Sequence, residues 1–148
     1  AFVELALLDI GEERLGDEYE SNPTRADYNP SANDNVIVEN ISAEDTALGW
    51  VGFAFAEENA DVLKEIAVDG GSGCVEPSIE TIADGSYPLS RPLFIYVSLN
   101  KAAEKPELDA FVDYYLGEAI SSVSEVASVS LPDDILGETV AAWDGAKG

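Results

Sequence analysis

Apolar residues recur at helical spacing at the start of the chain. Phe2, Leu5, Ala6, Leu8 and Ile10 lie in AFVELALLDIGEERL at positions that form one broad apolar face. No Ser, Thr, Asp or Asn stands ahead of this run to cap its free N–H groups. The pattern predicts a helix without an N-terminal cap, as expected if the chain were cut inside a helix.

A turn-rich stretch follows and leads into a second helical pattern. Residues 21–35, SNPTRADYNPSANDN, are crowded with residue types that favour turns, so they predict a long loop or a pair of turns. The next stretch, NVIVENISAED, predicts a short helix capped by Asp34 or Asn35, with Val38 and Ile41 on one face.

Three apolar runs predict strands. The run LGWVGFAFAEEN, residues 48–59, predicts a buried strand that turns directly into a helix, and LKEIAVD, residues 63–69, predicts a further strand. The run RPLFIYVSL, residues 91–99, is not interrupted by alternating polar residues. It therefore predicts a strand buried on both faces, as in the sheets of α/β proteins. Between the last two runs, DGGSGC predicts a turn.

The remaining periodic stretches predict helices. Residues 77–85 have proline at the first helical position and glycine at the end. Residues 106–116 place Leu, Phe, Val, Tyr and Leu on one face and continue past a glycine, and residues 131–146 form a last helix that begins near Asp133 or Asp134. The strands are few and separated by helices, so the predicted fold class is α/β.

Composition excludes several classes of partner. The chain of 148 residues has 30 acidic and 7 basic residues, a net charge of −23, which repels nucleic acid and anionic lipid. We interpret the excess as a solvated surface, of the kind found in proteins adapted to high salt, where screening relieves self-repulsion. No apolar run reaches the ~20 residues of a membrane span.

Candidate catalytic and metal motifs fail on inspection. The chain has no histidine, and no lysine stands beside a serine in a recognisable motif, so we predict no enzyme activity and no cofactor. Residues 27–38 have EF-hand spacing at first, but Ala32 and Val38 occupy the positions that require glycine and a carboxylate. Residues 70–73 are rich in glycine without the lysine of a phosphate loop, which leaves a hinge or turn.

Arg25 is the candidate ligand residue that the pattern leaves. It lies in a turn-rich loop among neutral donors, and the planar guanidinium group is well suited to bind a tetrahedral oxyanion. The alternative is an exposed arginine that pairs with Asp27.

Three long stretches resemble a known family. TRADYNPSANDNVIV, ALGWVGFAFAEENADVLKEIAV and ETIADGSYPLSRPLFIYV, in that order, are similar to the latter half of the phosphate-binding proteins of high-affinity phosphate ABC transporters. KPELDAFVDYYL and SVSLPDD resemble the closing helices of the same family. The resemblance covers nearly the whole chain, and its motifs are long and correctly ordered.

The resemblance implies a two-lobe fold of the periplasmic-binding-protein type II class, of which this chain is the carboxy-terminal portion. Residues 1–86 then form the remainder of the second lobe, and residues 87–148 form the hinge crossing and the returning part of the first lobe. Pro88, Arg91 and Pro92 would lie at the crossing between lobes, as hinge or interlobe residues rather than ligand contacts.

The resemblance also implies the ligand residues. Thr24, Arg25, Asp27 and Tyr28 match the family's Ser-Arg-x-Asp-Tyr pattern, with threonine in place of serine. Arg25 is thus expected to bind inorganic phosphate, with Thr24 and Asn35 as further candidates. Short-range donors in a cleft outweigh distant acidic charges, which salt screens beyond ~8 to 10 Å.

The implied partners are inorganic phosphate, a permease of the ABC transporter and the missing amino-terminal half of the same protein. The implied location is periplasmic or extracellular, with or without a membrane anchor in an amino-terminal segment. Cys74, the single cysteine, would then be free to pair with a cysteine of the missing half. The alternatives are a surface protein that keeps this fold without a ligand and a phosphatase-like enzyme.

Overall fold

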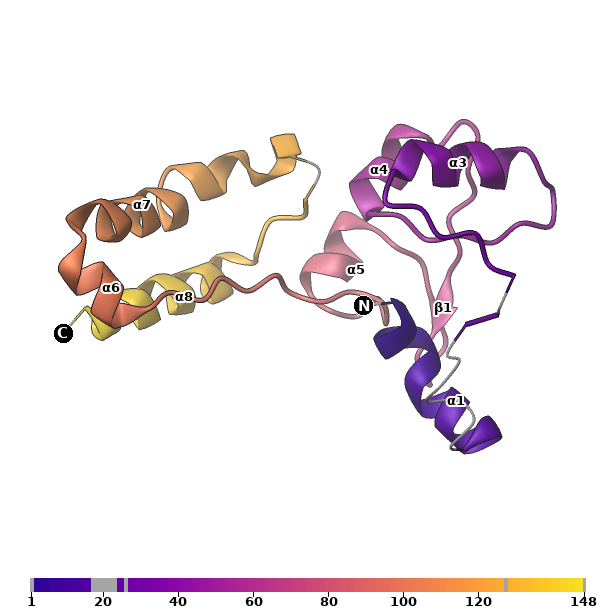
Figure 1. The fold of residues 1–148 in the computed structure, drawn as a ribbon, viewed down its shortest axis with the longest axis horizontal. Coiled ribbons are helices and arrows are strands. Elements are labelled where there is room, and N and C mark those ends of the chain that lie inside the picture. The colour runs from indigo at the N-terminus through magenta and orange to yellow at the C-terminus, as the bar shows by residue number, and fades with distance from the viewer. Residues whose placement is uncertain (1, 17–23, 26, 127, 148) are drawn as a thin grey trace. The chain divides into compact units, whose positions relative to one another are not determined.

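The computed structural model describes residues 2–16, 24–25, 27–126 and 128–147, and most of its regular structure is helical (Figure 1). The helices are a π-helical turn η1 (Val3–Leu7), α1 (Leu8–Leu15), α3 (Asp34–Ser42), α4 (Phe53–Glu58), α5 (Ile79–Ala83), α6 (Leu99–Glu104), α7 (Pro106–Leu116), a 3₁₀ segment η2 (Ala119–Val126) and α8 (Asp133–Ala146). The strands are β1 (Val68–Asp69) and β2 (Cys74–Val75).

The chain divides into two compact units. The first is Ala1–Pro77 with Tyr87–Ser90, and the second is Ser78–Ser86 with Arg91–Gly148. The predicted boundary between the two lobes lies near residue 87, and the assignment of residues 1–86 and 87–148 to two lobes stays a prediction.

The helix predicted at the start of the chain is confirmed. It consists of η1 followed by α1, and Leu7 at the N-cap of α1 provides no side-chain hydrogen bond. The wider π-helical turn was not predicted.

Asn33, rather than Asp34 or Asn35, caps α3. Its side-chain oxygen accepts a hydrogen bond from the backbone N–H of Asn35 at 3.0 Å. The predicted cap is wrong by one or two residues, because Asn33 has the extended backbone that a cap requires whereas Asp34 is already helical. Val38 is the buried residue of this helix, and Ile41 is half-buried.

Most of the predicted strands are wrong. Residues 48–52 form no strand, and only Val68 and Asp69 of the run 63–69 pair, in an antiparallel hairpin with Val75 and Cys74. A strand requires a partner for its N–H and C=O groups, and the described residues provide only this one ladder. The predicted turn at 70–73 is confirmed as the link of this hairpin.

The carboxylate of Asp69 shapes that turn. It accepts hydrogen bonds from the N–H groups of Gly71 at 2.8 Å and Gly73 at 2.9 Å, and these bonds lower the pKa of Asp69. Both glycines have positive φ, at 103° and 107°, which other residues rarely adopt.

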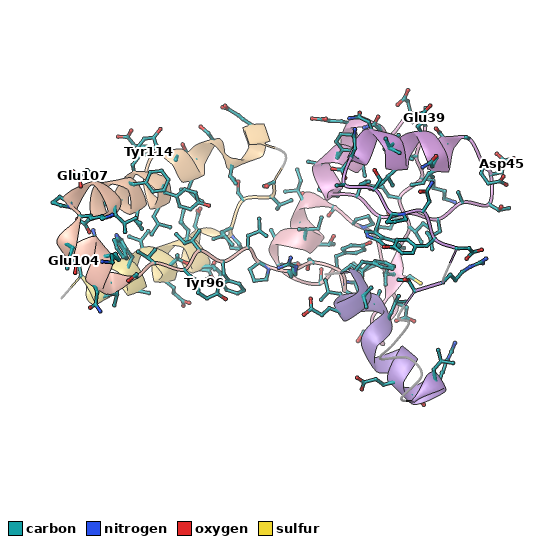
Figure 2. All side chains as sticks on the ribbon, viewed as in Figure 1. Glu39, Asp45, Tyr96, Glu104, Glu107 and Tyr114 are labelled. Carbon is teal, nitrogen blue, oxygen red and sulfur yellow. The ribbon has the colours of Figure 1, made fainter. Side chains whose placement is uncertain are left out.

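The apolar run 91–99 is not a strand, and the prediction that both its faces are buried is wrong for the structure described. Leu93, Phe94 and Tyr96 are 79%, 69% and 94% exposed. Figure 2 shows Tyr96 on the extended segment that leads into α6. The run has β propensity, but no strand of the described residues lies beside it to complete a ladder.

The second unit contains the main core. Helices α7 and α8 lie side by side there (Figure 1), and the core residues are Ala102, Val112, Leu116 and Trp143, with Val97, Leu108 and Val140 packed against them. Both helices are confirmed at their predicted positions, and η2 continues past Gly117 as a 3₁₀ segment. Phe111 and Tyr115 were predicted on one face with Val112 and Leu116, but they are exposed and pack on each other, with ring centroids 6.3 Å apart.

The predicted short helix at 77–85 is confirmed as α5, with a different start. Ser78 is the N-cap, and it exchanges hydrogen bonds with Thr81 in a capping box. Pro77 precedes the cap instead of occupying the first helical position.

The acidic residues lie at the surface. Among the described residues none that is polar or charged is buried, and Glu39 and Asp45 point outward from their unit (Figure 2). Within the same residues, no helix combines the length and apolar character needed to cross a bilayer.

Candidate functional site

Arg25 makes a two-point ion pair with Asp27. Its Nε donates to Oδ1 at 2.9 Å, and its Nη2 donates to Oδ2 at 2.6 Å. The side chains are 84% and 68% exposed. Hydrogen bonding, followed by charge attraction, raises the pKa of Arg25 and lowers the pKa of Asp27, so both groups stay ionised.

This pair occupies one edge of the guanidinium group. It uses two of the five N–H donors of Arg25, and the other three are at Nη1 and the second proton of Nη2. The observed pairing is the one named as the alternative to a ligand role, but it leaves donors that suit an oxyanion. The assignment of Arg25 as a ligand residue stays a prediction.

An aromatic stack lies next to this pair. The ring of Trp50 stacks on Phe2, at a centroid distance of 4.2 Å and an interplanar angle of 9°, and on Tyr28, at 6.2 Å and 19°. We call Phe2, Trp50 and Tyr28 the aromatic stack. It joins the Arg25 loop to two segments that are distant in sequence, and neither Phe2 nor Trp50 was predicted as part of the site.

Close approach of two segments holds Trp50 in place. A Cβ atom on the preceding residue, Gly49, would lie 2.5 Å from Ile41 Cδ1 and 3.3 Å from Ile37 Cγ2, so a larger residue here requires the Ile41 side chain to shift. The glycine next to an aromatic residue in GWVGF was the sequence signal available for this packing.

Thr24 and Asn35 have different surroundings. Thr24 is half-buried directly before Arg25. Asn35 lies in the first turn of α3, where both its backbone N–H and its Nδ2 donate to Asn33 Oδ1, at 3.0 and 3.2 Å. Within the described part of the chain, no hydrogen bond joins Asn35 to Arg25, and the ligand roles of Thr24 and Asn35 stay predictions.

The predicted hinge residues lie where the chain leaves the first unit. Pro88 packs on the β1–β2 turn, since a Cβ atom on Gly70 would lie 2.8 Å from Pro88 Cγ. Residues 87–90 belong to the first unit, whereas Arg91 and Pro92 are exposed at the start of the next segment of the second unit. A hinge role for Pro88, Arg91 and Pro92 fits this position and stays a prediction.

Within the described residues, a cluster of several charges outside this site is built around Lys147. Its ammonium group pairs with Asp113 and lies 3.8 Å from Asp109 and 3.6 Å from Asp144. A hydrogen bond to Asp113 raises the pKa of Lys147, and the pKa of Asp113 is lowered by Lys147 and by Trp143 Nε1. No set of three or more Cys, Asp or Glu side chains suited to a metal ion occurs in the described ranges.

Comparison with known proteins identifies the family. Residues 15–119 match the PBP superfamily domain. Protein SphX of Synechocystis sp. is 42% identical over 112 residues, which cover 75% of this chain and 33% of that protein. Phosphate-binding protein PstS of Staphylococcus saprophyticus is 36% identical over 120 residues, which cover 73% of this chain and 38% of that protein.

A solved structure agrees with these relatives. The crystal structure of a possible phosphate binding protein from Planctomyces limnophilus has a TM-score of 0.69 and 35% identity, and the match covers 84% of this chain and 45% of that one. The resemblance inferred from the sequence, with its α/β class, is thereby confirmed. The chain spans about a third of the length of the curated relatives it matches. It belongs to the PBP superfamily, and the matched range contains every residue predicted to bind ligand or form the hinge.

Proposed function

We propose that the chain is part of the phosphate-binding subunit of an ABC-type phosphate importer. The observation that carries the proposal is the geometry of Arg25: a guanidinium group fixed along one edge by Asp27, with three donors left on the other side. Relatives named as phosphate-binding proteins, at 36% identity and below, support phosphate as the oxyanion.

In this proposal, the Arg25–Asp27 ion pair allows a strongly acidic protein to bind an anion. Asp27 orients the guanidinium group before the ligand arrives, which reduces the side-chain entropy lost on binding. Phosphate oxygens then accept charge-assisted bonds from the free donors. The net charge of −23 acts mainly over distances that salt screens, so it slows capture more than it weakens the bound state.

The remainder of the binding site belongs to the rest of the protein. We propose that phosphate binds between two lobes, that the chain crosses between them near Pro88, Arg91 and Pro92, and that an amino-terminal half supplies further donors. The exposed apolar residues of the segment 93–97 would pack against that half. Lobe closure then captures phosphate for delivery to a permease, without covalent chemistry.

The proposed location is the periplasm or the cell exterior. Cys74 is a free, exposed thiol on β2, and a disulfide to the amino-terminal half is compatible with that location. A membrane anchor, where one is present, would belong to the amino-terminal segment.

Arg25→Ala in the complete protein tests the proposal. Loss of a charge-assisted contact is expected to weaken phosphate binding by about thirtyfold or more in titration calorimetry. Arg14→Ala is the matched control, because Arg14 is exposed on α1 in the same unit and has no proposed role. The phosphate affinity of this variant should equal that of wild type.

Other outcomes separate the alternatives. Unchanged affinity in Arg25→Ala would remove Arg25 from the site. No heat of phosphate binding by the wild-type complete protein would favour a surface protein that keeps the fold without the ligand. Phosphate release from a phosphomonoester in a turnover assay, with or without divalent metal, would favour the phosphatase-like enzyme.

A further inference from the structure

Within the described residues, the ion pair of Arg25 joins it to Asp27, two residues away. This ion pair orders the turn that carries Arg25. The N–H of Tyr28 donates to the carbonyl oxygen of Arg25 at 3.2 Å and closes the turn. The position of Arg25 is therefore tied to the position of Tyr28.

Tyr28 is attached to the unit through Trp50. The two rings are nearly parallel, with centroids 6.2 Å apart, which is within the range of favourable aromatic pairs. Trp50 also stacks on Phe2, with ring centroids 4.2 Å apart, and it follows Gly49, which lies against Ile41 of α3. Within the part of the chain that the structure describes, the stack of Tyr28 on Trp50 thus connects the turn of Arg25 to the rest of its unit.

Exposure argues against a purely core role for these rings. Trp50 is 42% exposed and Tyr28 is 46% exposed, whereas the core residues of the second unit are at most 9% exposed. The two rings are therefore only partly buried, and their stacking adds to the apolar burial that each provides.

We propose that Trp50 is a positioning residue for phosphate binding, which holds Arg25 in place through its stack on Tyr28. The inference rests on the proposed function and adds a residue that does not touch the ligand. If the proposal holds, substitution of Trp50 weakens phosphate binding only when Arg25 is present. A residue that merely stabilises the fold would weaken binding whether or not Arg25 is present.

A double-mutant cycle in the complete protein tests this requirement. Trp50→Leu should weaken inorganic phosphate binding by about five- to tenfold in titration calorimetry, since a leucine cannot stack on the Tyr28 ring. Trp50→Phe keeps a ring at this position and should restore affinity to within about twofold of wild type. In an Arg25→Ala background, Trp50→Leu should cause no further loss.

Leu48→Ala is the matched control. Leu48 is 71% exposed on the same segment and has no stacking contact, so its substitution should leave affinity unchanged. If Trp50→Leu does not fold, Tyr28→Leu breaks the same contact from the other side and should give the same five- to tenfold loss.

The possible results distinguish the positioning role of Trp50 from the phosphate function itself. Equal affinity of Trp50→Leu and wild type, or an equal loss from Trp50→Leu with and without Arg25, overturns the positioning role while the phosphate function stands. Failure of Trp50→Phe to restore affinity also overturns it, because stacking would not be the property that matters. Failure of the wild-type complete protein to bind phosphate defeats the proposed function itself.

Discussion

Substitution of Trp143 tests whether the packing of α7 on α8 holds the second unit together. The indole is only 8% exposed, and its Nε1 donates to Asp113 Oδ1 at 2.7 Å across the two helices. Trp143→Phe keeps an aromatic ring in the core but removes the donor and part of the apolar surface. Trp143→Ala removes the whole ring.

The expected costs follow from these contacts. A hydrogen bond to a charged acceptor is worth ~1.5 to 3 kcal/mol, and the lower end applies because the acceptor side chain is 48% exposed. With the smaller ring, Trp143→Phe should lower the free energy of unfolding by about 2 kcal/mol. Trp143→Ala should lower it by about 3 to 5 kcal/mol, a large part of a typical domain's stability.

Hydrogen exchange followed by mass spectrometry of the complete protein measures these losses locally. Peptides from α7 and α8 should exchange faster in both variants, by factors that match the two free energies, while peptides from α3 in the other unit stay unchanged. Wild-type protection of α7 in Trp143→Ala would refute the reasoning, since the ring would then not be what holds the two helices.

Asp113→Asn is the control for charge. An asparagine oxygen can still accept the Trp143 hydrogen bond, so protection near neutral pH should fall less than in Trp143→Phe. The folded pKa of Asp113 is lowered, so its contribution is present above the ordinary aspartate pKa of about 3.9 and is lost as the pH falls through the lowered value. The variant should therefore show a weaker loss of protection in that acidic range than wild type.

Two glycine substitutions test close packing and helix propensity. Gly49→Ala should destabilise α3 by about 1 to 3 kcal/mol, because the new Cβ atom would lie 2.5 Å from Ile41 Cδ1; Gly52→Ala, with open space around it and a φ of −62°, is its control. Faster exchange of α3 peptides in the control than in Gly49→Ala would contradict this. Gly137 lies in the interior of α8 with nothing within 4 Å of an added Cβ atom, so Gly137→Ala should stabilise α8 by about 0.5 to 1 kcal/mol and slow its hydrogen exchange. Faster exchange of α8 peptides would contradict this expectation.

The candidate site was partly readable from the sequence. Arg25 and Asp27 are two residues apart, so their pairing was an alternative that composition and spacing already offered. Phe2 and Trp50 were not predicted as part of the site, because Phe2 meets Trp50, and Trp50 meets Tyr28, only after three separate segments pack together. The cap of α3 was missed for a smaller reason: Asn33, Asp34 and Asn35 are all good caps, and only the backbone conformation selects Asn33.

The sequence by itself determined the features that depend on near neighbours: the helices α7 and α8, the glycine turn at 70–73 and the family, which long ordered motifs identify. Tertiary structure decided which apolar residues are buried, so Val112 enters the core while Phe111 remains exposed. It also decided which apolar runs form strands. The reason is physical: a helix satisfies its backbone hydrogen bonds within a few residues, whereas a strand such as the one predicted at 91–99 depends on a partner elsewhere in the chain.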